Sequence, residues 1–388
     1  MDFQLSDTQR LLKDTVHRLA HTVFQTKAAE WDQTGTYPAS NVEVLRQGGY
    51  LGMTFPQQFG GPELPLIDAV LVVEEIAQVC GVTGRIVVET NMGAVGTVMA
   101  YGTPQQQALV ADRVLHEGDK PAIAMTEPDA GTDLKALKTT ARHEGTHYVI
   151  NGLKHWITGG GISRTYLVFA RFQDARGHDE GIGALLVDKD TPGFAVTAIE
   201  DAMGLRGLPE AELRFRDCRV PQERVVVSGS QSDGFKKLMR AYNAQRIGAS
   251  AVALGIAQGA HNLAVKYLGT RTAFGQKLSA FQGLRWMMAQ DEMKLQAARL
   301  LIYRAACNAD PLANNVWLPR VDETAIAKAY VGTVAFEVTS DALQCFGAAG
   351  YSRRVPLERM LRDVRMFQIG GGTTQAQLDR IAQSLFSQ

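Results

Sequence analysis

The chain has 388 residues, enough for two or three packed domains, and its Lys plus Arg and Asp plus Glu counts are both 40. The formal net charge of zero argues against a nucleic-acid-binding protein that relies on bulk charge, so any anion site must be local. The cysteines lack metal-ligand or redox spacing, which predicts a reduced, cytoplasmic protein without a metal site; they are Cys80, Cys218, Cys307 and Cys345. No apolar run reaches the length of a membrane span, and the acidic N-terminus is unlike a secretory signal.

The first part of the chain, from Ser6 to about Val114, has a helical pattern. Ser6 is a suitable N-cap for the first helix, and Thr103-Pro104 is a suitable start for the last one. Between them, the segment 67–80 has a mostly apolar face, and the small, apolar segment after Gly81 carries one cation, Arg85. This region is therefore expected to be a helical domain over residues 1–118.

The pattern changes at Lys120, where apolar and polar residues begin to alternate between Gly, Asp and Pro turns. Strands are expected over 148–158, 165–172, 181–189, 193–199 and 211–221, without intervening helices. This favours an antiparallel sheet or small barrel in a domain over residues 119–228. Within the first of these strands, Asn151-Gly152 is a strong hairpin-turn signal.

Helical periodicity returns at Gly234, with long stretches over 235–269, 282–308 and 322–346 and a shorter one over 357–364. These suit a C-terminal four-helix bundle over residues 229–388. The predicted fold is mainly α with a central β domain.

Near the C-terminus, RMFQIGGGTTQAQ (residues 365–377) breaks a helix with three consecutive glycines. Glycines allow a backbone to pass close to a planar or phosphorylated ligand, and Thr373 and Gln375 then stand at a helix start, which favours anions. The alternative is an ordinary glycine turn between two helices.

Four further stretches carry polar groups suited to a large anionic ligand, and each also has a structural interpretation. AIAMTEPDAGTD (122–133) offers hydroxyls and exposed N–H groups, or is a well-capped loop. NGLKHWITGGG (151–161) carries Trp156, which could be a ligand platform or part of a core. The helix 241–260 places Asn243 and Arg246 on one face, and RTAFGQKLSAFQ (271–282) begins with Arg271; either arginine could bind an anion or form an ordinary salt bridge or surface contact.

In this order and spacing, these stretches together with DALQCFGAAGY (341–351) resemble the acyl-CoA dehydrogenase family over essentially the whole chain. The resemblance implies FAD as cofactor, an acyl-CoA thioester as substrate, and a homotetramer, or at least a dimer, whose FAD sites are shared between subunits. It implies flavin contacts from Met125, Thr126, Thr132, Trp156, Thr158, Thr373 and Gln375, with Thr158 at the flavin N5 edge. It also implies contacts to the FAD of a neighbouring subunit from Arg271, Phe274, Gln344 and Gly347, and contacts to CoA from Asn243 and Arg246.

The chain departs from the family at the catalytic base. The two family positions for a Glu correspond to Gly371 and Gln245, and neither residue can accept the proton. Either another carboxylate such as Glu89 replaces the base in a dehydrogenase, or the chemistry has changed.

The segments TGRIVVETN, AYNAQRIGA and MFQIGGGT resemble one branch of the family, the 3-sulfinopropionyl-CoA desulfinases. This resemblance favours changed chemistry, in which Arg85 binds the terminal sulfinate of a short acyl-CoA. The alternative role of Arg85 is a buried salt bridge. A third hypothesis is a non-catalytic protein that binds flavin or acyl-CoA.

Overall fold

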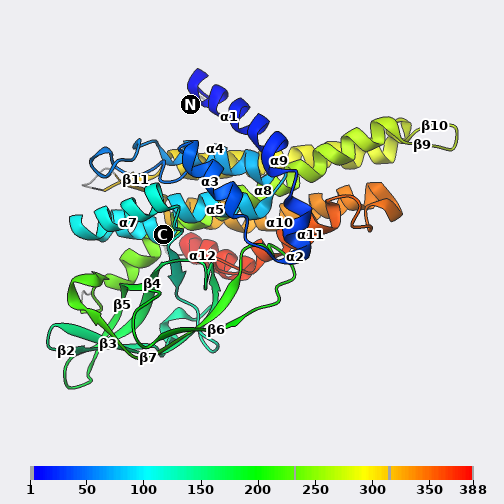
Figure 1. Ribbon diagram of the computed structural model, residues 1–388. Helices are drawn as coiled ribbons and strands as arrows, with labels where there is room; N and C mark the ends of the chain where they lie inside the picture. The colour runs from blue at the N-terminus through cyan, green and yellow to red at the C-terminus, as the bar shows by residue number, and fades with distance from the viewer. Residues whose placement is uncertain (1–3, 231–232, 313–315, 387–388) are drawn as a thin grey trace.

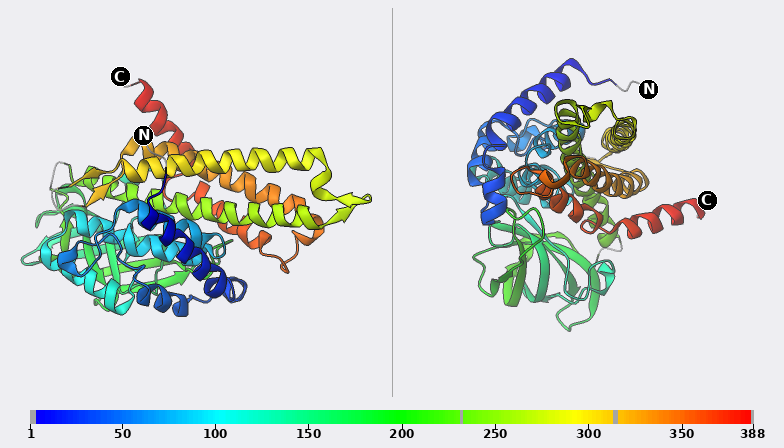
Figure 2. Two further views of the ribbon diagram at one scale, coloured as in Figure 1. Left: turned by 90° about the horizontal axis from the view of Figure 1, so that it is seen from above. Right: turned by 90° about the vertical axis from the view of Figure 1, so that its right-hand side faces the viewer.

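The computed structural model describes residues 4–230, 233–312 and 316–386. Helices from both ends of the chain form a thick layer on one side of a central β domain (Figures 1 and 2). The predicted fold class is thereby confirmed. No helix in the described ranges has the length and apolar character needed to cross a membrane.

The first and last helices of the N-terminal domain begin at caps that neighbouring residues encode. Ser6 and Gln9 form a reciprocal capping box at the first helix, and Thr103 and Gln106 form another at the last. The helices are α1 (Asp7–Leu19), α2 (Ala28–Thr34), α3 (Ala39–Gln47), α4 (Leu66–Ala77), α5 (Gly81–Asn91), α6 (Ala94–Tyr101) and α7 (Pro104–Glu117). Every residue of α4 and α5 is buried, so the charged side chains of these helices must find partners inside the protein.

The β domain contains one large sheet in the order β6-β7-β3-β2-β4-β5-β8, with β1 paired to β4. Its strands are β1 (Ala122–Ala124), β2 (Thr140–Glu144), β3 (His147–Thr158), β4 (Thr165–Gln173), β5 (Asp179–Asp188), β6 (Phe194–Ile199), β7 (Glu210–Pro221) and β8 (Val225–Val227). Most pairs are antiparallel as expected, but β1 and β2 both run parallel to β4. Loops, not helices, lead the chain into these parallel positions. The absence of helices between the strands therefore did not exclude parallel pairing.

The predicted hairpin turn at Asn151-Gly152 is wrong. These residues lie inside β3, at a shift in the register between β3 and β7. The Asn151 side chain bonds to Asp217 on β7, and a Cβ on Gly152 would come within 2.4 Å of the Thr139 hydroxyl oxygen. The glycine therefore permits close approach at a bulge.

The C-terminal domain is built on three long helices and two shorter ones: α8 (Gly234–Thr270), α9 (Gln282–Cys307), α10 (Val321–Phe346), α11 (Leu357–Arg365) and α12 (Thr374–Phe386). A small hairpin, β9 (Thr272–Ala273) and β10 (Gln276–Lys277), joins α8 to α9 and projects at the end of the bundle far from the β domain (Figures 1 and 2). A second pair, β11 (Asp310–Pro311) and β12 (Trp317–Leu318), lies between α9 and α10.

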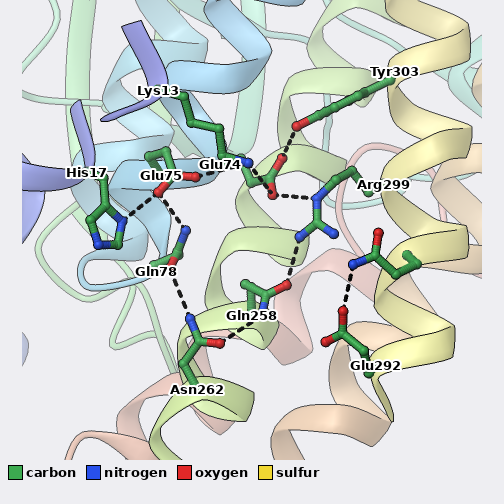
Figure 3. Close-up of polar contacts among 11 residues, drawn as sticks. Lys13, His17, Glu74, Glu75, Gln78, Gln258, Asn262, Glu292, Arg299 and Tyr303 are labelled. Atoms are coloured by element: carbon green, nitrogen blue, oxygen red, sulfur yellow. Dashed lines mark hydrogen bonds and ion pairs between the residues drawn. The ribbon is translucent and has the colours of Figure 1, made fainter. Parts of the chain in front are cut away.

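Two buried carboxylates on α4 join the N-terminal helices to the C-terminal bundle (Figure 3). Glu74 accepts hydrogen bonds from Arg299 Nε at 2.8 Å and from the Tyr303 hydroxyl at 2.7 Å, both on α9. Glu75 pairs with Lys13 and His17 of α1, at 3.2 and 2.8 Å. The two charges are thus compensated by helices on opposite sides of α4.

Candidate functional site

The glycine-rich segment between α11 and α12 lies against two cations from the bundle. Gly371 and Gly372 have φ angles of 73° and 93°, a conformation that glycine adopts without steric cost. Arg246 Nε donates to the Gly371 carbonyl oxygen at 2.9 Å, and the buried Lys328 ammonium donates to the Gly372 carbonyl. Burial lowers the pKa of Lys328 to about 8. The segment is therefore fixed in place by α8 and α10.

On the β side, buried contacts bring the turn after β1 against β3. Lys154 Nζ donates to the Met125 carbonyl oxygen at 3.0 Å and to Glu127 at 2.8 Å. The His155 N–H donates to the Thr126 carbonyl oxygen at 2.9 Å. A register shift follows Lys154 in the pairing of β3 with β7. Trp156, at this irregularity, has a φ of 57° and is 53% exposed, so it is a surface platform rather than a core residue.

A small cavity of about 60 Å³ lies where α5, α8, β3 and the turn after β1 meet. Its lining residues are Arg85, Glu89, Ile123, Met125, Thr126, Trp156, Ile157, Thr158, Tyr242 and Gln245. The cavity therefore brings Arg85 together with Gln245 and with four residues expected to contact the flavin.

Arg85 and Glu89 form a buried ion pair at this cavity. Arg85 Nε donates to Glu89 Oε1 at 2.7 Å, and Gln245 Nε2 donates to the same oxygen at 2.7 Å. Burial opposes the charge on Arg85, but Glu89, Tyr242 and Glu210 together outweigh it, and the pKa of Arg85 is raised. The salt-bridge interpretation of Arg85 is thus realised. It involves only Nε, and no described residue accepts a hydrogen bond from either Nη atom.

A larger cleft of about 950 Å³ opens beside this cavity, between the β domain and the bundle. Met125, Thr126 and Thr132 line it from the β side, while Asn243, Arg246 and Gly371 line it from the helical side, with Gly372 beside them. Further cations at its wall are Lys135, Lys236, Arg240, Arg320 and Arg380, against the acidic residues Asp310 and Asp322. In a chain with zero net charge, these side chains give the cleft a local excess of positive charge.

Arg246 has no carboxylate partner among the described residues. Its Nη1 donates to Asn243 Oδ1 at 2.8 Å, and its guanidinium lies over the Tyr242 ring, 4.9 Å from the centroid. Burial lowers the pKa of Arg246. The guanidinium is therefore positioned by neutral groups and retains its charge for a ligand.

Comparison with known proteins supplies the family. Models of the acyl-CoA dehydrogenase N-terminal, middle and C-terminal domains match residues 6–116, 122–218 and 232–386. The chain belongs to the acyl-CoA dehydrogenase family.

Two curated relatives are each 46% identical over 388 residues and are named 3-sulfinopropanoyl-CoA desulfinase. The relative from Variovorax paradoxus is matched over 99% of this chain and 95% of its own length, and that from Paraburkholderia xenovorans (strain LB400) over 100% and 98%. Among solved structures, butyryl-CoA dehydrogenase from Megasphaera elsdenii superposes with a TM-score of 0.92 at 33% identity, covering 99% of this chain and 100% of that one.

Membership of this family implies a flavin, and residues around the small cavity and the larger cleft have features that fit one. The exposed indole of Trp156 offers a flat apolar surface beside the turn at Thr126. Thr126 and Thr132 line the cleft, and their hydroxyls make no hydrogen bond with a described residue. At the start of α12, Thr373 Oγ1 accepts from the Ala376 N–H at 3.1 Å and serves as the cap, while Gln375 is exposed.

The remaining expected FAD contacts lie at the opposite end of the acyl-CoA dehydrogenase fold. Arg271 directly precedes the projecting β9–β10 hairpin, and Phe274 lies in its turn, 92% exposed with a φ of 51°. Gln344 and Gly347 end α10 nearby, where Phe346 stacks on Tyr267 with centroids 4.0 Å apart. These residues do not line either cavity described above, so within one chain they are separate from the flavin-facing residues.

Sequence reasoning missed Glu210. It begins β7 directly opposite Thr158 of β3, and Thr158 Oγ1 donates to its carboxylate oxygens at 2.8 and 3.0 Å. Burial raises the pKa of Glu210 to about 7. The charged residue at the start of a strand was visible in the sequence, but its pairing depends on the register between strands 52 residues apart.

Within the described ranges, no group of His, Cys, Asp or Glu residues could hold a metal ion.

Proposed function

We propose that this chain is a 3-sulfinopropanoyl-CoA desulfinase, which converts 3-sulfinopropanoyl-CoA and water into propanoyl-CoA and sulfite. In the balanced reaction, the C–S bond is replaced by C–H, and the sulfur gains the oxygen of water. No electrons are gained or lost overall, so the reaction needs no external oxidant. The four curated relatives with this name, 43–46% identical along nearly the whole chain, support the proposal.

The observation that carries the proposal is the composition of the small cavity. It presents a guanidinium, Arg85, where Gln245 occupies one family position for the base, and Gly371 occupies the other at the adjoining cleft. A short acyl chain with a terminal anion must lose its hydration to enter such a space, which is costly without a cationic partner. The Nη atoms of Arg85 can supply that partner as charge-assisted hydrogen-bond donors.

The large cleft suits the CoA portion of this substrate. Arg246 has a charge that no described carboxylate neutralises, and the neighbouring lysines and arginines add further positive charge for phosphates. Asn243 holds the Arg246 guanidinium in position through a neutral amide. The thioester is thereby directed towards the cavity that contains Arg85.

We propose FAD as the flavin, bound by Met125, Thr126, Thr132, Trp156, Thr158, Thr373 and Gln375. Bound FAD would supply a flat wall to the small cavity, in which we place the acyl chain, and a ribose hydroxyl to polarise the thioester carbonyl. The chain itself would contribute orientation: Trp156 and the turn at Thr126 form a surface for a flat ring, and Arg85 orients the anionic end of the substrate.

We further propose a homotetramer, or at least a dimer, in which Arg271, Phe274, Gln344 and Gly347 reach the FAD of a neighbouring subunit. Their separation from the flavin-facing residues within one chain supports this arrangement. Exposed apolar side chains also recur every seven residues along α9, namely Trp286, Met293 and Leu300, at 60%, 72% and 48% exposure. Such a stripe is typical of a helix covered in an assembly. We also propose that the domains span residues 1–118, 119–228 and 229–388, and that the protein is located in the cytoplasm.

The direct test is sulfite release from 3-sulfinopropanoyl-CoA by the purified protein, with propanoyl-CoA measured as the co-product. Equal amounts of both products are expected. Binding of the thioester without release of sulfite would exclude the desulfinase and favour a non-catalytic binding protein.

A second candidate, an acyl-CoA dehydrogenase that uses Glu89 as its base, has one observation in its favour. Glu89 lines the small cavity, and its Oε1 lies 2.7 Å from Gln245 Nε2 at a family base position. Anaerobic mixing with butyryl-CoA or glutaryl-CoA distinguishes the two functions. Rapid loss of the flavin absorbance would support the dehydrogenase, whereas the desulfinase predicts no bleaching.

A further inference from the structure

The contact between Thr158 and Glu210 determines whether the Thr158 hydroxyl can donate or accept a further hydrogen bond. Thr158 has a single hydroxyl proton, and both carboxylate oxygens of Glu210 lie within hydrogen-bond distance of Oγ1, at 2.8 and 3.0 Å. While Glu210 is ionised, the hydroxyl proton points towards it. Thr158 Oγ1 can then accept a hydrogen bond from a ligand but cannot donate one.

Glu210 does not line the cavity itself, but its carboxylate lies against the hydroxyl of Thr158, which does, and it has no directly paired cation there. No described residue forms an ion pair with it. Arg85 lies across the cavity, and the buried Lys120 ammonium bonds to the Thr158 carbonyl oxygen at 3.3 Å and approaches Ser163 Oγ at 3.5 Å. Both cations lower the pKa of Glu210, although burial and Glu89 raise it. The charge thus acts at a partly buried position, where electrostatic effects are larger than in bulk water.

We propose that Glu210 is a positioning residue that makes the bound flavin a poor acceptor of electrons. The inference rests on the proposed function, because it requires the flavin N5 edge to face Thr158. The Glu210 carboxylate would oppose the negative charge that a flavin gains on reduction.

The hydrogen bond at Thr158 and the charge of Glu210 would have opposite effects on the stability of a reduced flavin. An acceptor at Thr158 favours a reduced N5–H, whereas the carboxylate charge disfavours the reduced ring. The charge effect is the larger, because a full charge acts strongly at a partly buried site while exchange of one neutral hydrogen bond has a small net value. Glu210 therefore hinders dehydrogenation independently of the missing base.

The test is the midpoint potential of the FAD in the loaded protein, measured anaerobically against a reference dye at about pH 8.5, where Glu210 is ionised. Glu210→Gln keeps the size and an acceptor for Thr158 but removes the charge. At a fixed potential, the ratio of reduced to oxidised FAD should rise at least about tenfold, which equals about 30 mV for a two-electron couple. Flavin content is measured first in every sample.

Glu212→Gln is the matched control. Glu212 lies two residues along β7, and its carboxylate also accepts a threonine hydroxyl, at 2.6 Å, but from Thr197, which does not line the cavity. Its neutralisation should leave the potential unchanged. A third variant, Thr158→Val, removes the hydroxyl and keeps the charge of Glu210, so its potential should stay nearer the wild-type value than that of Glu210→Gln.

The following results would contradict the inference. A flavin-loaded Glu210→Gln protein with an unchanged potential would refute it and leave the proposed function standing. If that variant does not bind flavin, Glu210→Thr gives the same neutralisation with a residue suited to a strand. Loss of flavin from both variants would assign Glu210 a purely structural role. Wild-type protein that binds no flavin would refute both this inference and the proposed flavin site.

Discussion

Glu89 accepts hydrogen bonds through one carboxylate oxygen, Oε1, from both Arg85 one helical turn away and Gln245 on another helix. The amide of Gln245, which we propose to stand at a family base position, is therefore a donor to a carboxylate in the same cavity. This contact ties together the residue proposed to bind the substrate anion, the replaced base and the alternative candidate base.

Replacement of Arg85 should separate substrate binding from cofactor binding. Arg85→Lys keeps the charge but loses the planar fork, so sulfite release should fall at least about tenfold for each charged hydrogen bond lost. Arg85→Leu should reduce it to background. Sulfite release and flavin content are both measured, and flavin content should match that of the wild type.

Arg299→Lys is a suitable control for this series, because Arg299 also pairs with a buried glutamate but lies in the contact between α4 and α9. It should retain sulfite release per folded molecule. Full activity in Arg85→Leu would show that Arg85 is structural.

Glu89→Gln should have opposite effects on stability and on substrate binding. It leaves the buried Arg85 without its counter-charge, so the free energy of unfolding should fall by about 3 kcal/mol. The same unpaired guanidinium should bind a sulfinate more tightly, and the KM for 3-sulfinopropanoyl-CoA should fall. Denaturant unfolding and steady-state sulfite release measure the two effects.

This substitution also discriminates between the proposed functions. If Glu89 were the base of a dehydrogenase, its loss would slow flavin bleaching by roughly a hundredfold to ten-thousandfold. Sulfite release that persists in Glu89→Gln would be incompatible with that role.

Gly371→Glu should introduce a slow dehydrogenase activity. A Cβ at Gly371 meets only the Arg246 Cγ, at 4.0 Å, so the side chain has room, although its φ of 73° strains any residue other than glycine. Bleaching of the flavin by butyryl-CoA should become detectable, and adding Glu210→Gln should accelerate it.

Gly371→Gln is the matched control, since it has the same size and backbone strain but no basic group. It should not bleach the flavin. Equal bleaching in the Glu and Gln variants would show that the new side chain acts by reshaping the cleft and not as a base.

Asp291 should make the stability of the protein depend on pH. Its side chain is fully buried on α9, neither carboxylate oxygen accepts a hydrogen bond from a described residue, and Lys294 lies 3.7 Å away. Burial and nearby Asp341 raise the pKa of Asp291 from 3.8 to about 7. Between these values the unfolded chain has lost a proton that the folded chain retains, so stability falls as the pH rises.

Asp291→Asn removes this penalty. At about pH 8 the free energy of unfolding should exceed that of the wild type by on the order of a few kcal/mol, and near pH 4 the difference should disappear. Denaturant unfolding at both pH values measures this. Glu337→Gln, which changes a half-exposed partner of Lys294, should show little pH-dependent difference. An equal gain at both pH values would indicate a packing effect.

The sequence was a good guide where the determining contacts are local. The caps at Ser6 and Thr103 depend on residues three positions away, and both are present. Arg85 and Glu89 are one helical turn apart, so their pairing was within reach of spacing alone. The same holds for Asn243 and Arg246.

The errors and omissions involve contacts between distant segments. Asn151-Gly152 has the composition of a turn, but Asp217 and Thr139 accommodate it as a bulge inside β3. The contact between Thr158 and Glu210 depends on how β3 aligns with β7, which no local pattern specifies. The parallel pairing of β1 and β2 with β4 was missed for the same reason.

The carboxylate of Glu74 limits how this protein could be recombined with its relatives. It depends on Arg299 and Tyr303 of α9 in the C-terminal domain, whereas neighbouring Glu75 pairs with α1 of its own domain. A chimera that exchanges the N-terminal domain alone would inherit α4 without the α9 that matches it, and Glu74 would then be buried with only Lys13, at 3.8 Å, to offset its charge. Productive crossovers should therefore either preserve Arg299 and Tyr303 or exchange α4 and α9 together, although more than two hundred residues separate them in the sequence.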